Sequence, residues 1–139
     1  MDIDYIVPRK LLIEDGNSSR RLYNEQQKLA ENFSQFSFVR GRNDAIYLAG
    51  ALRTNAGVVY QVRVDLPPDY PHSIPYVFPV GWEANCPHAY TQGNLCIMRP
   101  DQWRPIFSLA FVVAKVALWL NKYDVYRTKG YWPGNEQQH

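Results

Sequence analysis

Two cysteines and a histidine lie close together in residues 84–105, ANCPHAYTQGNLCIMRPDQWRP, here called the thiol segment. A thiolate is a strong nucleophile for carbonyl carbon, and it must be accessible when its substrate is large. Gly93 offers a turn before Cys96, while prolines and Trp103 restrain the chain after it. Such a restrained loop suits a nucleophilic thiol. An unpaired cysteine is also among the most often buried residue types, so Cys96 alone leaves both interpretations open.

Other thiol chemistry fits the segment less well. The spacing of Cys86, His88 and Cys96 includes no Cys-x-x-Cys pair and no fourth ligand, so we expect no metal site. The same spacing disfavours a thioredoxin-like redox pair. A papain-like pair needs a histidine far downstream of the cysteine, where only His139 is found. A disulfide between the two cysteines is a further alternative, which a reducing compartment disfavours.

Composition narrows the class of protein. The 139 residues are 46% hydrophobic and 20% charged, so we expect residues 1–139 to form a single domain. A net charge of +2 gives no basic surface for nucleic acid. The first residues, MDIDYIVPRK, do not resemble a signal peptide, and the longest apolar stretch, residues 108–120, is too short to span a bilayer. We therefore expect a cytoplasmic protein without a membrane partner.

The elements before the thiol segment are predicted from their periodicity. Residues 19–33 are rich in helix formers, and Asn17, Ser18 or Ser19 can serve as the N-cap of a helix there. Leu22, Leu29 and Phe33 fall on one face at helical spacing, so we expect that face to pack on the core. An antiparallel meander is then predicted from three alternating segments, 36–41, 45–53 and 58–67.

A proline-rich arm, residues 67–81, joins the meander to the thiol segment. Its five prolines exclude a helix and leave room for a short edge strand at 76–78. After the thiol segment, Ser108 can cap a helix over residues 109–123 that is apolar on nearly all sides. A helix of this kind is usually buried against a sheet, so the predicted fold class is α+β.

The order and spacing of these motifs resemble the ubiquitin-conjugating enzymes. That family has a Tyr-Pro-x-x-Pro-Pro arm, and this chain has DYPHSIPYVF at 69–78. The family then has His-Pro-Asn, a catalytic cysteine ten residues after the histidine, a preceding glycine, and Trp-x-Pro seven or eight residues later. Here CPH at 86–88 stands at the tripeptide, Cys96 follows ten residues after Cys86, and WRP begins seven residues beyond, at 103–105. The resemblance covers roughly residues 18–124.

The resemblance implies the ubiquitin-conjugating-enzyme fold, without the two C-terminal helices of most members, and no cofactor. It implies that Cys96 is the thioester-forming nucleophile and that Cys86, at the position of the family's histidine, is structural. His88 replaces the family's asparagine, and an imidazole N–H can support either the oxyanion or the loop. The family's acid that orients the incoming lysine is expected beyond the central helix at Asp124, with Asp101 as the alternative.

Without these two C-terminal helices, the chain resembles bacterial relatives of the family that are encoded beside cyclic-oligonucleotide synthases in CBASS antiphage operons. This implies an E2-like transferase that carries the C-terminal tail of such a synthase, or otherwise of a ubiquitin-like modifier, and conjugates it to a target amine. An E1-like adenylating protein is the expected activating partner. The alternative is a non-catalytic binding module of the same fold.

Overall fold

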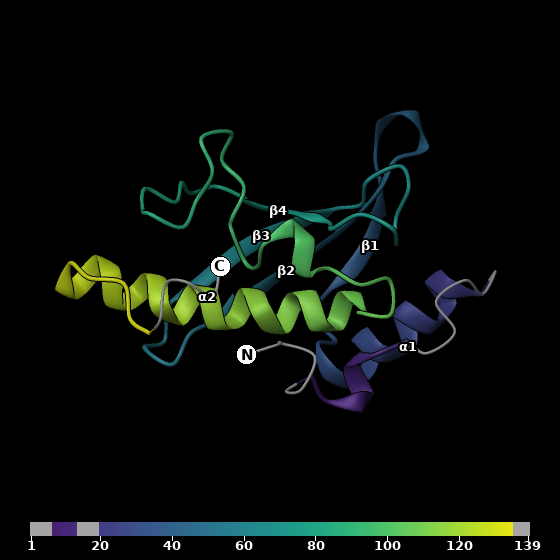
Figure 1. Ribbon diagram of the computed structural model, residues 1–139, viewed down its shortest axis with the longest axis horizontal. Helices are drawn as coiled ribbons and strands as arrows, with labels where there is room; N and C mark the ends of the chain where they lie inside the picture. Colours follow the sequence, from purple (N-terminus) through teal and green to yellow (C-terminus); the bar gives the residue numbers. More distant parts are fainter. Residues whose placement is uncertain (1–6, 14–19, 135–139) are drawn as a thin grey trace.

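A long helix lies across one face of an antiparallel sheet (Figure 1). The computed structural model describes residues 7–13 and 20–134. The sheet has the order β1-β2-β3-β4, and its strands are β1 (Ser37–Arg40), β2 (Ile46–Arg53), β3 (Val59–Asp65) and β4 (Tyr76–Pro79). All three neighbouring pairs are antiparallel, which confirms the predicted meander and edge strand.

The central helix, α2, spans Leu109–Lys129. Ser108 caps it as predicted, because its hydroxyl accepts a hydrogen bond from the Phe111 N–H at 3.0 Å. Its buried face packs on the sheet through side chains that include Val112, Val116 and Trp119. The helix ends at Gly130, whose φ of 83° is the left-handed conformation that glycine adopts at little cost. It therefore runs past residue 123, where the apolar pattern predicted its end.

Helix α1 (Arg21–Asn32) forms where the sequence predicts it, and two of the three predicted residues face the core, since Leu29 is buried and Phe33 is partly buried against it. Its candidate caps at 17–19 lie outside the described residues. Leu22 is 39% exposed, whereas the buried positions are Arg21, Glu25 and Leu29. The prediction was wrong for Leu22 alone, because a charged pair at i and i+4, Arg21 and Glu25, is buried beside it.

The buried pair links α1 to three other parts of the chain. Glu25 is fully buried and accepts hydrogen bonds from the Leu109 N–H at 2.8 Å, from Arg21 Nε at 3.0 Å and from the Tyr70 hydroxyl. Arg21 also donates to the carbonyl oxygens of Pro105 at 2.6 Å and Phe107 at 2.8 Å. Because every charge has partners, α1, the arm and the end of the thiol segment are held together at the start of α2.

Three short 3-10 helices complete the described structure: η2 (Arg9–Leu11), η3 (Arg42–Asp44) and η4 (Pro100–Gln102). The residue after η2, Leu12, pairs in an isolated bridge with Phe107, which lies just beyond the thiol segment. In the part of the chain that the structure describes, neither α1 nor α2 has an apolar run that could cross a membrane.

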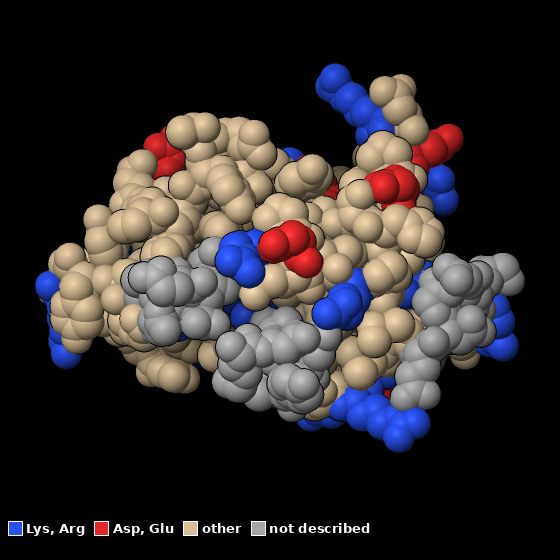
Figure 2. Space-filling view, in the orientation of Figure 1, with Lys and Arg blue, Asp and Glu red and all other residues tan. Residues whose placement is uncertain are grey.

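Charge is unevenly distributed over the surface. Figure 2 shows basic and acidic side chains at the turn between β1 and β2, where the sequence has Arg40, Arg42 and Asp44, whereas the surface beyond β4 on this face is almost uncharged. The sequence explains this, since residues 70–98 contain one charged side chain, Glu83. Residues 84–98 of the thiol segment therefore carry no charged side chain, and its charges begin at Arg99.

Candidate functional site

The thiol segment leaves β4, folds into a tight loop and returns over α2 (Figure 1). The Tyr90 N–H donates to the Asn94 carbonyl at 2.9 Å, and the Gly93 N–H donates back to the Tyr90 carbonyl at 2.9 Å. Gly93 has a φ of 102°, which a side chain would strain, so the predicted turn before Cys96 depends on glycine.

The loop is attached to the free edge of β4. Val80 donates to Gln61 on β3, so alternation turns the backbone groups of Pro75, Val77 and Pro79 away from β3. Two of these three residues are prolines without an N–H. The third residue, Val77, accepts the Leu95 N–H at 2.8 Å through its carbonyl. The residue directly before Cys96 is thus bonded to the sheet, and the prolines blunt the edge around it.

Cys96 is a half-buried free thiol, and the Tyr90 hydroxyl lies close enough to interact with it. The side chain of Tyr90 forms a hydrogen bond with the Cys96 thiol, and this bond, with burial of the ring, raises the pKa of Tyr90 to about 12. The phenol therefore stays protonated, and able to donate, across the physiological range. Sequence reasoning missed Tyr90, because the contact depends on how the loop closes at Gly93.

His88 is held at two places. Its carbonyl accepts the Cys96 N–H at 3.0 Å and the Trp119 indole N–H at 3.1 Å. Its imidazole lies against the indole of Trp132, with 4.6 Å between ring centroids. Trp132 follows α2 and also contacts Trp119, at 5.2 Å between centroids. The chain after α2 is thereby packed against the loop that holds Cys96.

Cys86 lies in a different environment. It is half-buried and free, and burial raises its thiol pKa, an effect that a hydrogen bond from the His88 backbone N–H partly offsets. Fewer of its thiols are thiolates at neutral pH than for an ordinary cysteine. Among the described residues, no group of three His, Cys, Asp or Glu side chains could hold a metal ion.

The structure corrects the placement of the predicted acid. Asp124 lies inside α2 rather than beyond it, is 9% exposed, and accepts a hydrogen bond from the Tyr60 hydroxyl at 2.5 Å. The placement was wrong because α2 continues past its apolar run. Asp101 lies in η4, is exposed, and pairs with Arg99 at 3.3 Å. A role in orienting a lysine stays a prediction for both.

Trp103 anchors the end of the thiol segment. It is 8% exposed, its indole donates to the Pro71 carbonyl at 2.8 Å, and its ring meets Phe107 edge-on at 5.6 Å. The arm and the residues before α2 are joined through this side chain.

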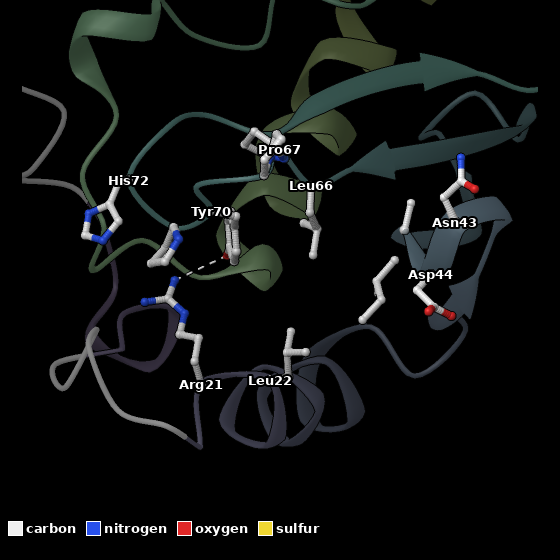
Figure 3. A pocket seen from close by; sticks show the side chains of 12 residues that line it. Arg21, Leu22, Asn43, Asp44, Leu66, Pro67, Tyr70 and His72 are labelled. Atoms are coloured by element: carbon white, nitrogen blue, oxygen red, sulfur yellow. Dashed lines mark hydrogen bonds between the residues drawn. The ribbon is translucent and has the colours of Figure 1, made fainter.

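A cavity of about 700 Å³ opens between α1, the β1–β2 turn and the arm (Figure 3). Arg21 crosses it to donate to the Tyr70 hydroxyl at 3.2 Å, a bond drawn in the figure. Its lining residues, among them Leu22, Asp44 and His72, do not belong to the thiol segment. The cavity is therefore separate from the candidate site at Cys96.

Solved structures share this architecture. The ubiquitin conjugating enzyme E2 from Plasmodium falciparum is 18% identical with a TM-score of 0.56, over 74% of this chain and 97% of that one. The Plasmodium vivax ubiquitin conjugating enzyme E2 is 21% identical with a TM-score of 0.54, over 70% and 96%. The Vps23 UEV, solved in complex with ubiquitin, is 16% identical with a TM-score of 0.56, over 89% of each chain. These similarities confirm the predicted ubiquitin-conjugating-enzyme fold.

Sequence comparison gives a narrower assignment. No curated protein matches the chain. A family model described as "Type II CBASS E2 protein" matches residues 25–139, a range that includes α2, the sheet and the whole thiol segment. The chain therefore belongs to the type II CBASS E2 family of ubiquitin-conjugating-like proteins.

Proposed function

We propose that this protein carries the C-terminus of a partner protein as a thioester on Cys96 and transfers it to a target amine. The proposed carrier is a cyclic-oligonucleotide synthase, with a ubiquitin-like modifier as the second candidate, and an E1-like protein is the proposed source of the activated carboxyl. The observation that carries the proposal is the half-buried Cys96 thiol in a loop fixed to β4, with the Tyr90 hydroxyl on its sulfur.

The chemistry has two acyl transfers. The Cys96 thiolate attacks the activated carbonyl of the carrier, a C–S bond forms, and the activating group leaves. A neutral amine then attacks the thioester carbonyl, a C–N bond forms, the C–S bond breaks, and the nitrogen's proton restores the Cys96 thiol. Exchange between similar thiols is nearly balanced, so alignment matters most in the first step. The second step must stabilise an oxyanion.

Two backbone N–H groups at the thiol are already engaged and do not serve that task. The N–H groups of Leu95 and Cys96 already donate to the carbonyls of Val77 and His88. Once the sulfur is acylated it is a poor acceptor, and the Tyr90 hydroxyl beside it is released to donate to the oxyanion. We propose Tyr90 for this role and loop support for His88, whose carbonyl holds the Cys96 backbone.

Single-turnover discharge of the preformed thioester to free lysine tests this assignment. Tyr90→Phe should charge at the wild-type rate and discharge about a hundredfold more slowly, as when one oxyanion donor is lost. Tyr23→Phe, on the exposed side of α1, is the matched control and should discharge normally. Equal discharge by both variants would remove Tyr90 from the reaction.

The non-catalytic alternative makes the opposite prediction. A binding module would hold the carrier without any adduct that a reducing agent removes, and Cys96→Ser would leave its affinity for the carrier unchanged.

A further inference from the structure

Every charge that α2 presents to solvent is positive. The charged side chains of this helix are Lys115, Lys122, Asp124, Arg127 and Lys129. The one acid, Asp124, is buried and accepts the Tyr60 hydroxyl, whereas the four bases are half-buried or exposed. In Figure 1 the sheet lies behind α2 and α1 lies near one end of it. The side of α2 that is turned away from the sheet is therefore basic.

Lys115 and Lys122 lie two turns apart on that side. Seven residues of helix separate them by about 10.5 Å along the axis. Burial lowers the pKa of Lys115, and the like charge of Lys122 lowers it further, so the two amines repel each other. Neither lysine has an ion-pair or hydrogen-bond partner among the residues that the structure describes. Two half-buried positive charges without a counter-charge favour the approach of an anion.

An apolar row runs beside the two lysines. Leu118 lies between them in the sequence and is 58% exposed. Ala114 precedes it by one turn and Val125 follows it by two, and both are half-buried. Because Ala114 and Ala117 have short side chains, another helix can approach α2 closely beside Leu118. The surface thus combines an apolar row with a basic flank.

The spacing of these groups selects among the surfaces that could cover them. A helix with carboxylates at i and i+7 places them about 10.5 Å apart on one side, which matches the two lysines, and an apolar residue between them would cover Leu118. A second copy of this chain would bring lysines against lysines, which repel. A flat membrane suits the surface poorly, because Lys115 is half-buried and Leu118 is the one strongly exposed apolar side chain in the row.

We propose that the face of α2 formed by Lys115, Leu118 and Lys122 docks an acidic amphipathic helix of a partner protein. Two carboxylates seven residues apart on that helix pair with the two lysines, and an apolar side chain between them packs on Leu118. This docking goes beyond the proposed function and does not depend on a thioester at Cys96.

The test uses a capped, fluorescein-labelled, alanine-based helical peptide that has two glutamates seven residues apart and leucines between them. On titration with the wild-type protein its anisotropy should rise with saturation, and the NMR signals of the Leu118 methyl groups should shift. A control peptide with glutamine in place of both glutamates should bind about tenfold more weakly, because both charged contacts are lost. A second control has the glutamates five residues apart, on different sides of the helix, and should lose a similar factor.

Variants of the protein separate the charged contacts from the apolar one. Lys115→Gln and Lys122→Gln should each weaken binding of the first peptide by about fivefold, the effect of one ion pair. Leu118→Gln should weaken it by about fivefold to tenfold, because more than half of a leucine side chain leaves water on docking. Arg42→Gln removes an exposed base at the β1–β2 turn, is the matched control, and should bind as the wild type does. The comparison of peptides needs no variant to fold.

Three outcomes overturn the inference: equal affinity for the three peptides, unshifted Leu118 methyl groups, or wild-type affinity in both lysine variants. Two further measurements cover the other occupants. Binding to vesicles of phosphatidylserine and phosphatidylcholine, without binding to the peptide, would assign the face to a membrane. A dimer in sedimentation that Leu118→Gln dissociates would assign it to a second copy of the chain. Either result contradicts a partner helix.

Discussion

Variants at the contact between His88 and Trp132 test whether His88 supports the loop or takes part in the chemistry. The imidazole lies 4.6 Å from the Trp132 ring between centroids, and the His88 carbonyl binds both the Cys96 N–H and the Trp119 indole. If His88 is a loop support, removing either ring should loosen the same structure. We therefore expect the effects of His88→Ala and Trp132→Ala on the free energy of unfolding to be coupled.

The size of the coupling follows from the geometry. Aromatic pairs at this separation contribute about 0.5–1.5 kcal/mol beyond the area they bury. Trp132 is 9% exposed, so Trp132→Ala should itself cost about 3–5 kcal/mol as a buried large aromatic. In a double-mutant cycle, the double variant should lose about 1 kcal/mol less free energy of unfolding than the sum of the losses in the two single variants.

The assay combines urea unfolding with single-turnover discharge of the thioester. Loop support predicts that both single variants slow discharge by a similar factor, about fivefold for each kcal/mol by which the loop is loosened. Tyr131→Ala, at a neighbouring side chain that is 55% exposed, is the control and should change neither quantity. The reasoning is refuted if His88→Ala alone loses about a hundredfold in discharge, with recovery in His88→Asn, because that pattern belongs to an oxyanion donor.

Three further predictions concern the frame around the site. Trp103→Ala should cost about 3–5 kcal/mol in urea unfolding, and an unchanged midpoint would contradict its place as a buried anchor. Glu25→Ala should cost a similar amount, about 3–5 kcal/mol, because Arg21 is left buried and unneutralised, whereas Glu31→Ala on the exposed face should be nearly silent. The Tyr60 pKa is raised to about 12 by burial and by Asp124, so the fold retains that proton and should lose stability as pH rises from 10 towards 12. Tyr60→Phe should lose less stability than the wild type between pH 8 and pH 11 in unfolding curves, and the remaining loss belongs to other tyrosines with raised pKa values, such as Tyr70 and Tyr90.

Much of the fold was predictable because its signals are local. Alternation marks β2 and β3, Ser108 marks the start of α2, and the prolines mark an edge strand. The burial of Arg21 and Glu25 on α1 was not predictable in this way. Periodicity assigns burial from side-chain polarity, and Glu25 is buried because Arg21 on the same helix and two donors from distant parts of the chain, Tyr70 and Leu109, satisfy it.

In the candidate site, too, some features were predictable from local patterns and others were not. The order of the motifs indicated Cys96 as the nucleophile, which stays a prediction, and Gly93 indicated the turn before it. The interaction of the Tyr90 hydroxyl with the sulfur and the tilted contact of His88 with Trp132 depend on how loops close, which no local pattern encodes. The true end of α2 did have a signal, since Gly130 follows basic residues in the last turn, but the end of the apolar run at Tyr123 outweighed it.

The central claim is the thioester on Cys96, and intact mass measurement of the charged protein tests it most directly. Wild type, Cys86→Ser and Cys96→Ser are incubated with the activated carrier and measured before and after a reducing agent. The account predicts a carrier adduct on wild type and Cys86→Ser that the reducing agent removes, and on Cys96→Ser either no adduct or one that resists reduction, as an oxyester does. A reducible adduct on Cys96→Ser, or its loss in Cys86→Ser, would contradict the account.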